Sequence, residues 1–178
     1  RFAATTTAHQ PRPVFQGHNS ARLLIAGQAP GARVHQSGRP FTDPSGDRLR
    51  NWMGIGEDTF YDANRIAILP MGFCFPGYDI NGSDLPPPAI CSKRWRVDIL
   101  AFFPNIKLTL PVGGYAQKWH LQTKERVDQV VSNWWKYQPN MLPLPHPSWR
   151  NNAWIKLNPW FEADLVPFLR QRVQEVLK

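Results

Sequence analysis

Short apolar runs alternate with stretches of helical character along this chain of 178 residues. Four apolar runs have the length of buried strands: 22–27, 65–69, 106–112 and 141–144. Five further segments are expected to be helices: 46–54, 89–103, 115–121, 124–137 and 159–177. Strands that alternate with helices form mostly parallel sheets covered on both faces. We therefore expect an α/β fold, a three-layer α/β/α sandwich with a central four-stranded, mostly parallel sheet.

The length suits a single domain over residues 1–178, because such a chain can bury a real core. Residues 1–20 are polar and show no periodicity, so we expect them to form an extended arm. Ser45 is expected to cap the first helix and Asn158 the last one. Pro167 is expected to kink that last helix, because proline cannot donate a backbone hydrogen bond.

Ligands of open parallel sheets bind beyond the carboxyl ends of the strands. Three polar or proline-rich loops follow predicted strands at that edge: 27–44, 70–88 and 145–153. The site is therefore expected to be built from these three loops.

The first of these loops combines glycines with an amide and an aromatic side chain. Gly27 and Gly31 permit a close approach of the backbone to a ligand. Gln28 can donate to and accept from an amide-bearing ligand, and Phe41 can stack on a planar ring. The pattern is neither GxGxxG nor a P-loop. A tight turn with a core phenylalanine is the alternative interpretation of each residue alone.

The third loop contains the stretch LPHPSWRNN, residues 144–152. His146 stands between two prolines, and it can act as an electrophile, a base or a phosphate contact. A histidine that only holds a turn is an equally common alternative. Trp149 and Arg150 can enter a groove as a wedge and a phosphate or base contact. Other polar candidates are His35, Asp43, Asp47 and Asp84.

The formal charge of +8 and the pI near 9.9 favour a nucleic-acid partner. Eight tryptophans and ten phenylalanines beside 21 Lys and Arg suit a surface that pairs with phosphate and stacks on bases. A merely basic protein is the alternative. No apolar run reaches membrane-spanning length and no signal-peptide pattern is present. With only two cysteines, we expect a cytoplasmic protein without membrane association.

Three motifs together resemble the uracil-DNA glycosylase superfamily. Gly27-Gln-Ala-Pro-Gly31 resembles its first motif, the water-activating loop. Gly38-Arg-Pro-Phe41 resembles the segment with the uracil-stacking phenylalanine. His146-Pro-Ser148 resembles the last motif, the histidine loop that also inserts into DNA. The resemblance covers residues 22 to 170 in the same order and spacing.

The resemblance implies a nucleoid-associated, monomeric DNA glycosylase of base-excision repair. It would hydrolyse the N-glycosidic bond of a flipped-out uracil or other damaged base in double- or single-stranded DNA. The candidate catalytic residues are His146, Gln28 and Asp43. The residues expected to bind the base are Gly27, Ala29, Pro30, Gly31, Phe41 and Met71. Those expected to contact DNA are Pro147, Ser148, Trp149, Arg150 and Asn151.

The first motif departs from the family pattern at the position of the acid. Gln28 stands where the thermophile-type branch has glutamate, and Ala29 where the main uracil enzymes have aspartate. Asp43 is the nearest acid in the sequence. A non-catalytic DNA-binding member of the superfamily is therefore the alternative function, and an enzyme acting on free nucleosides is a less favoured one.

The cysteines resemble part of the iron–sulfur site of the thermophile-type branch, which is the closest branch. Cys74 and Cys91 match two of its four ligand positions. The other two ligands would precede the first strand, and residues 1–21 contain no cysteine. We therefore expect no cluster, no other cofactor and no bound metal.

Overall fold

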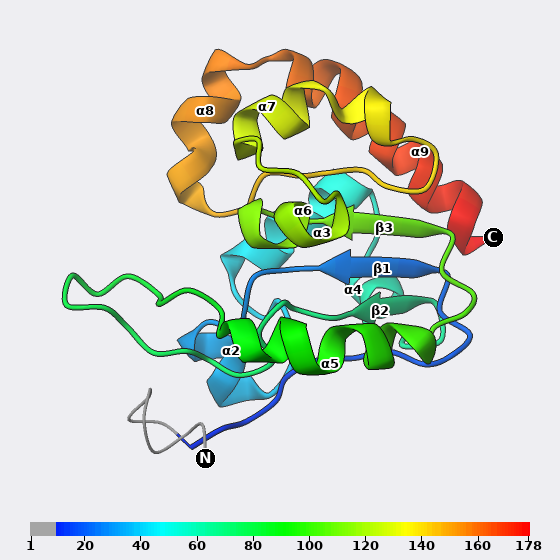
Figure 1. Cartoon of the computed structure of the whole chain (residues 1–178). Helices are drawn as coiled ribbons and strands as arrows, with labels where there is room; N and C mark the ends of the chain where they lie inside the picture. The colour runs from blue at the N-terminus through cyan, green and yellow to red at the C-terminus, as the bar shows by residue number, and fades with distance from the viewer. Residues whose placement is uncertain (1–9) are drawn as a thin grey trace.

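The computed structural model describes residues 10–178, so the first nine residues of the expected arm lie outside it. Its sheet has three parallel strands in the order β2-β1-β3 (Figure 1). They are β1 (Leu23–Ala26), β2 (Ile66–Ile68) and β3 (Leu108–Pro111). In the register of the sheet, Leu23 pairs with Ile66 on one side and with Leu108 on the other. These strands correspond to the first three predicted runs.

The expected fourth strand, residues 141–144, is not a regular strand of the described chain. It runs beside β3 through two isolated parallel bridges, Thr109 with Met141 and Val112 with Leu144. Pro111 lies between these bridges and has no N–H with which to continue the ladder. The fourth strand is therefore not confirmed as a regular strand, and the proline of β3 explains why the pairing is interrupted.

The described part of the arm packs along the opposite edge of the sheet. Gln16 and Ile68 of β2 exchange two backbone hydrogen bonds of 3.1 and 2.8 Å in an antiparallel bridge. The Val14 N–H donates to the carbonyl of Phe73 at 2.8 Å. Around Gln16 this segment is extended, and it covers the unpaired edge of β2.

Helices follow each strand and also begin within two of the predicted loops. They are α2 (Ala32–Ser37), α3 (Pro44–Met53), α4 (Glu57–Phe60), α5 (Ala89–Ala101), α6 (Gly114–His120), α7 (Val127–Ser132), α8 (Asn152–Leu157) and α9 (Val166–Leu177). The predicted helices over 46–54, 89–103 and 115–121 are confirmed within a few residues. The short helices α2, α4 and α8 were not predicted, since six residues or fewer show little periodicity.

Three helix boundaries differ from the prediction. The helix expected over 124–137 is shorter, because α7 ends at Ser132 and a separate 3-10 turn follows over 134–137. Asp43, and not Ser45, caps α3, where its carboxylate accepts from the N–H of Gly46. The predicted final helix is divided, because residues 161–165 form a π-helical turn before α9. Pro167 lies in the first turn of α9, where a missing N–H is tolerated.

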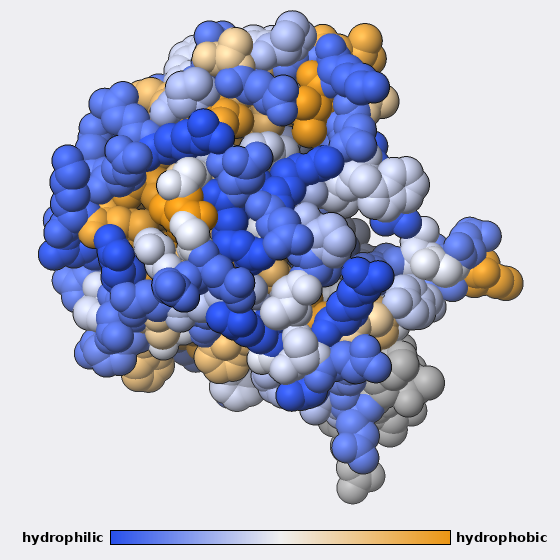
Figure 2. Space-filling view, turned by 180° about the vertical axis from the view of Figure 1, so that it is seen from behind, coloured by the Kyte–Doolittle hydropathy of each residue, from blue (hydrophilic) through white to orange (hydrophobic). Residues whose placement is uncertain are grey.

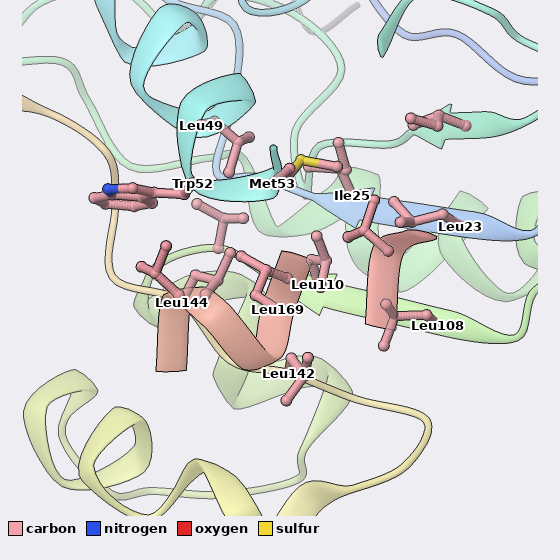
Figure 3. Packing of buried hydrophobic residues seen from close by; sticks show 14 of the residues in the cluster. Leu23, Ile25, Leu49, Trp52, Met53, Leu108, Leu110, Leu142, Leu144 and Leu169 are labelled. Carbon is pink, nitrogen blue, oxygen red and sulfur yellow. The ribbon is translucent and has the colours of Figure 1, made fainter. Parts of the chain in front are cut away.

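Helices pack against both faces of the sheet. Leu23 and Ile25 of β1 lie in one cluster with Leu49 of α3 and Leu169 of α9 (Figure 3). Leu24 points to the other face, where it joins a second cluster against partly buried side chains of α5. Adjacent residues of a strand point to opposite faces, so β1 contributes to both layers of the core. The α/β/α layering is thereby confirmed. No helix of residues 10–178 is long and apolar enough to cross a membrane.

Candidate functional site

The first two predicted loops are joined where β1 and β2 end. The N–H of Met71 donates to the carbonyl of Gly27, and that of Gly72 donates to Gln28, both at 2.9 Å. The ladder between the two strands therefore continues past their ends and fixes the start of both loops. Residues 27–44 were expected to form one continuous loop. The structure differs, because α2 begins within this range at Ala32.

A cavity of about 80 Å³ opens at this edge of the sheet. The predicted site residues that line it are Gly27, Gln28, Ala29, Pro30, Gly31, Phe41, Asp43 and His146. They come from the first loop and from the histidine loop, which are far apart in the sequence. The structure therefore brings together most of the residues expected to bind and convert a base.

Phe41 forms one wall of the cavity in an unusual backbone conformation. Its φ of 54° lies in the left-handed region, which is uncommon for an aromatic residue. The hydroxyl of Tyr61 donates to the carbonyls of Pro40 and Phe41, at 2.8 and 3.0 Å. The ring of Phe41 lies over Gly27, where an added Cβ would be 3.5 Å from it. The strained turn thus presents the ring to the cavity beside the first loop.

The carboxylate of Asp43 is held at the start of α3. Its Oδ1 accepts from the hydroxyl of Ser45 at 2.6 Å and from the N–H of Gly46 at 3.3 Å. Gly46 is required at this point, because an added Cβ would be 1.9 Å from the carbonyl oxygen of Phe41. The turns that carry Phe41 and Asp43 therefore form one packed unit.

His146 is placed by backbone contacts with the end of β3. The N–H of Gly113 and the amide of Gln117 both donate to the carbonyl of Leu144, at 2.9 and 2.8 Å. The carbonyl of His146 itself accepts from the side chain of Asn151 at 2.6 Å. Gly113 lies against His146: its φ of 79° favours glycine, whereas an added Cβ would make only an ordinary van der Waals contact with the Cβ of His146 at 3.7 Å.

Burial lowers the pKa of His146 below its ordinary value. The negative charge of Asp43 opposes this change, and the positive charge of Arg150 adds to it. The ring is therefore neutral near pH 7, and it can donate one N–H to an oxygen in the cavity.

The histidine loop also borders a groove of about 360 Å³ beside the cavity. Arg33, Arg48 and Arg150 line this groove. Arg48 fixes the loop, because its Nη1 donates to the carbonyl of Ser148 at 3.1 Å and to Oδ1 of Asn152 at 2.8 Å. Three guanidinium groups along one groove suit the phosphates of a nucleic acid.

The residues expected to contact DNA have different environments. Trp149 is 71% exposed, and Arg150 lies over its ring at 5.5 Å from the ring centroid. Pro147 is buried and Ser148 is partly buried, although both border the groove. The amide of Asn151 closes the loop on His146, which is a structural role.

Met71, expected to touch the base, lies elsewhere. Its buried side chain packs with Ala26 and Ala116, while Pro70 lines the cavity. Successive residues of an extended chain point to opposite faces of the sheet. The residue that faces the cavity is therefore Pro70, one position before Met71, and Met71 faces the other side.

Asp84 enters both the cavity and the groove from the second loop. An added Cβ at Gly31 would be 3.8 Å from its Oδ2. Partial burial raises the pKa of Asp84; the charge of Arg150 lowers it and that of Asp43 raises it further. The sequence marked Asp84 only as a polar candidate, because a contact across the two loops leaves no local pattern.

A buried cation fixes the end of β2. Arg96 of α5 is 1% exposed, and its Nη1 donates to the carbonyls of Leu69 and Pro70 at 3.0 and 2.9 Å. Its Nη2 donates to Nε2 of His120 at 2.7 Å. Burial lowers the pKa of Arg96 to about 10, so the guanidinium stays charged at neutral pH. Since Pro70 lines the cavity, Arg96 positions one wall of the site.

The contact with Arg96 predicts that the protein is sensitive to acid. Burial, and then the charge of Arg96, lower the pKa of His120 to about 3. The unfolded state therefore binds a proton that the folded state excludes between about pH 6.5 and 3. The free energy of unfolding should fall as the pH decreases through this window, by up to about 3 kcal/mol at pH 4. His120→Gln keeps an acceptor for Arg96 but cannot bind a proton. Urea unfolding at pH 7 and pH 4 should therefore show a smaller loss of the free energy of unfolding in this variant than in wild type. If wild type and His120→Gln lose the same free energy of unfolding between pH 7 and pH 4, the acid sensitivity does not come from His120.

The two cysteines of this sequence supply half of the ligands that an iron–sulfur site needs. An iron–sulfur cluster of the Cys₄ type needs four thiolates, and the whole sequence contains two cysteines. Both thiols are free, and burial, followed by the nearby Cys91, raises the pKa of Cys74, which disfavours the thiolate that a metal needs. Within residues 10–178, no three histidine, cysteine, aspartate or glutamate side chains gather in a way that could hold a metal ion.

The family model of the uracil DNA glycosylase superfamily matches residues 14–170, which is most of the chain. The matched range contains all three loops of the cavity and the whole sheet. The cavity unites the glycine-rich turn, the aromatic wall and the histidine loop on whose motifs the resemblance was based. This chain belongs to the uracil DNA glycosylase superfamily.

Proposed function

We propose that the protein is a DNA glycosylase that hydrolyses the N-glycosidic bond of a flipped-out uracil or another damaged base. The observation that carries this proposal is the shared cavity of Phe41, His146 and residues 27–31. An aromatic ring, a neutral imidazole and a glycine-rich turn meet there. A flipped base needs these three partners: a stacking surface, a donor to its oxygen and a close backbone.

His146 is proposed to stabilise the departing base. When the bond between the sugar carbon and the base nitrogen breaks, its electron pair moves to the base, whose oxygen becomes negative. A neutral imidazole donates an N–H to that oxygen without surrendering the proton. The lowered pKa of His146 keeps the ring in this form near neutral pH.

Asp43 is proposed to serve the attacking water. Water adds to the cationic sugar carbon and loses a proton, which a carboxylate can accept. The hydrogen bonds from Ser45 and Gly46 orient one carboxylate oxygen of Asp43, and the other remains for water. Gln28 lines the same cavity and can orient the water or the base by its amide.

The groove is proposed to hold the DNA backbone. Its three arginines provide charge-based affinity that does not depend on sequence and that falls as salt rises. Trp149, exposed at the edge of this groove, can contact the bases beside the flipped nucleotide.

A single-turnover assay tests the proposal directly. Oligonucleotides with one uracil, hypoxanthine or xanthine are incubated with excess protein and then cleaved by alkali at abasic sites. We expect cleavage on at least one of them. Absence of cleavage on all three, together with salt-sensitive binding, would support the alternative of a non-catalytic DNA-binding member. That alternative is favoured by Gln28 and Ala29, which occupy the usual position of the acid.

Asp43→Asn is expected to slow base release by about a hundredfold, because asparagine cannot accept the proton of water. The substitution keeps the helix cap, since asparagine caps as well as aspartate. The rate is measured at saturating protein on the preferred oligonucleotide. Asp98→Asn is the matched control, because it makes the same charge change on the exposed surface of α5. Asp84→Asn is the comparison within the site, and a larger loss there would transfer the role to Asp84.

A further inference from the structure

Residues 77–85 form a finger that projects from the molecule between β2 and α5. The chain leaves the body there and returns to it before α5 begins (Figure 1). Seen from behind, the finger stands out at the right edge with a hydrophobic side chain at its end (Figure 2). Tyr78 and Asp84 form an antiparallel bridge, and the N–H of Leu85 donates to the carbonyl of Gly77 at 2.9 Å. The two arms of the finger are thus paired with each other.

The tip of the finger is a closed turn. Oδ1 of Asp79 accepts from the N–H groups of Asn81 and Ser83, at 2.9 and 2.8 Å. Gly82 has a φ of 75°, which lets the chain reverse direction without strain. The tip therefore has a defined shape, because the Asp79 side chain satisfies the backbone of the turn.

Ile80 is the residue that this turn presents to solvent. It is 99% exposed, more than any other large hydrophobic side chain of residues 10–178. The finger has polar neighbours on both sides of Ile80, so the side chain is not the edge of a larger apolar patch. An isoleucine that projects alone at the end of a paired turn has the shape of an apolar wedge and not of a broad interface.

The base of the finger is stiff. Residues 86–88 are three consecutive prolines, which restrict the backbone between the finger and α5. Pro87 and Pro88 pack closely on Gly72, where an added Cβ would be 3.1 and 3.0 Å from them. The returning arm of the finger is therefore anchored against the chain that follows β2.

The finger stands beside the mouth of the cavity. Asp84, at the end of its returning arm, lines both the cavity and the groove. The charge of Arg150 lowers the pKa of Asp84, so the finger and the histidine loop are neighbours. The groove between them is lined by three arginines against the two carboxylates of Asp43 and Asp84, and this positive balance complements a polyanion. The occupant indicated by this charge is duplex DNA.

We propose that Ile80 is a wedge that enters the base stack of duplex DNA next to the flipped nucleotide. Proteins that kink or open duplexes insert apolar side chains such as isoleucine between base steps. Trp149, on the opposite loop, contacts the same duplex from the other border of the groove. This proposal deepens the proposed function. The flipped base rests on that function, whereas the insertion of Ile80 into the duplex does not.

The test compares Ile80→Ala and Ile80→Leu with wild type. A duplex with a stable abasic analogue and a neighbouring 2-aminopurine reports unstacking by its fluorescence, without any base release. Val97→Ala is the matched control, because Val97 is 67% exposed on α5 and does not line the cavity or the groove. Base release from uracil-containing duplex and single strand is measured in parallel.

We expect Ile80→Ala to lose most of the fluorescence increase and to release base from duplex about tenfold more slowly. On single-stranded DNA it should match wild type, because no stack has to be opened. Ile80→Leu should restore the duplex response, and Val97→Ala should behave as wild type. Unchanged fluorescence in Ile80→Ala, or an equal loss on both strand states, would overturn the wedge. If Ile80→Ala loses the fluorescence increase but wild type releases no base, the glycosylase function is refuted and the wedge is retained.

Discussion

Replacing His146 by alanine is expected to slow base release by about a hundred- to a thousandfold, which is the usual cost of losing one donor to a developing oxyanion. The imidazole is half-buried and lines the cavity wall, where its N–H can reach an oxygen of the bound base. The rate is measured in single turnover with protein in excess over DNA. Binding to an uncleaved duplex should change little, because the groove keeps its three arginines.

The control for this variant is His18→Ala. His18 is exposed, and its ring bonds only locally, to Ser20 at 2.8 Å. This variant should react at the wild-type rate. If His146→Ala also reacts at that rate, His146 does not stabilise the leaving base. If DNA binding by His146→Ala weakens by the same factor as its rate of base release, His146 has a role in DNA affinity instead.

Gly46→Ala is expected to lower the free energy of unfolding by about 3 kcal/mol or more. Helix propensity alone would predict the opposite, since alanine is about 1 kcal/mol better than glycine within a helix. The added Cβ, however, would lie 1.9 Å from the carbonyl oxygen and 2.7 Å from the carbonyl carbon of Phe41. Backbone cannot yield as a flexible side chain does, so α3 or the strained turn of Phe41 must move. Urea unfolding at neutral pH measures the change.

The matched control for this prediction is Gly56→Ala. Gly56 precedes α4 with a φ of −78°, and an added Cβ would meet nothing within 4 Å. Its free energy of unfolding should stay within about 1 kcal/mol of wild type. Equal stability of the two variants would show that the Phe41 turn relaxes freely. In that case the turn does not hold the aromatic wall in place.

Local patterns were sufficient to predict the regular elements near the sheet. The strands around Leu24, Ala67 and Leu110 are buried on every residue and apolar except at Thr109, as is typical of strands covered on both faces. Their order, with β1 in the centre, follows from packing and is not written in any single run. The interrupted fourth strand depends on Pro111, whose missing N–H matters only because residues 141–144 lie beside it.

The candidate site shows the same division. Gly27, Phe41 and His146 could be named from motifs, because each motif has a short and specific pattern. Asp84 and Arg96 could not be assigned a role, since their partners lie on other loops or helices. Contacts between segments that are distant in the sequence leave no local pattern in the sequence.

The sequence by itself determined which residues are chemically able to act: a stacking ring, a histidine between prolines and a basic surface. It also predicted the three strands of the sheet and the helices α3, α5 and α6, because those depend on contacts within a few residues. Only the tertiary structure decided that Asp84 joins Asp43 and His146, that Arg96 holds Pro70, and that Ile80 stands alone on a rigid finger. The physical reason is that burial, pKa and exposure depend on what the whole chain brings near an atom.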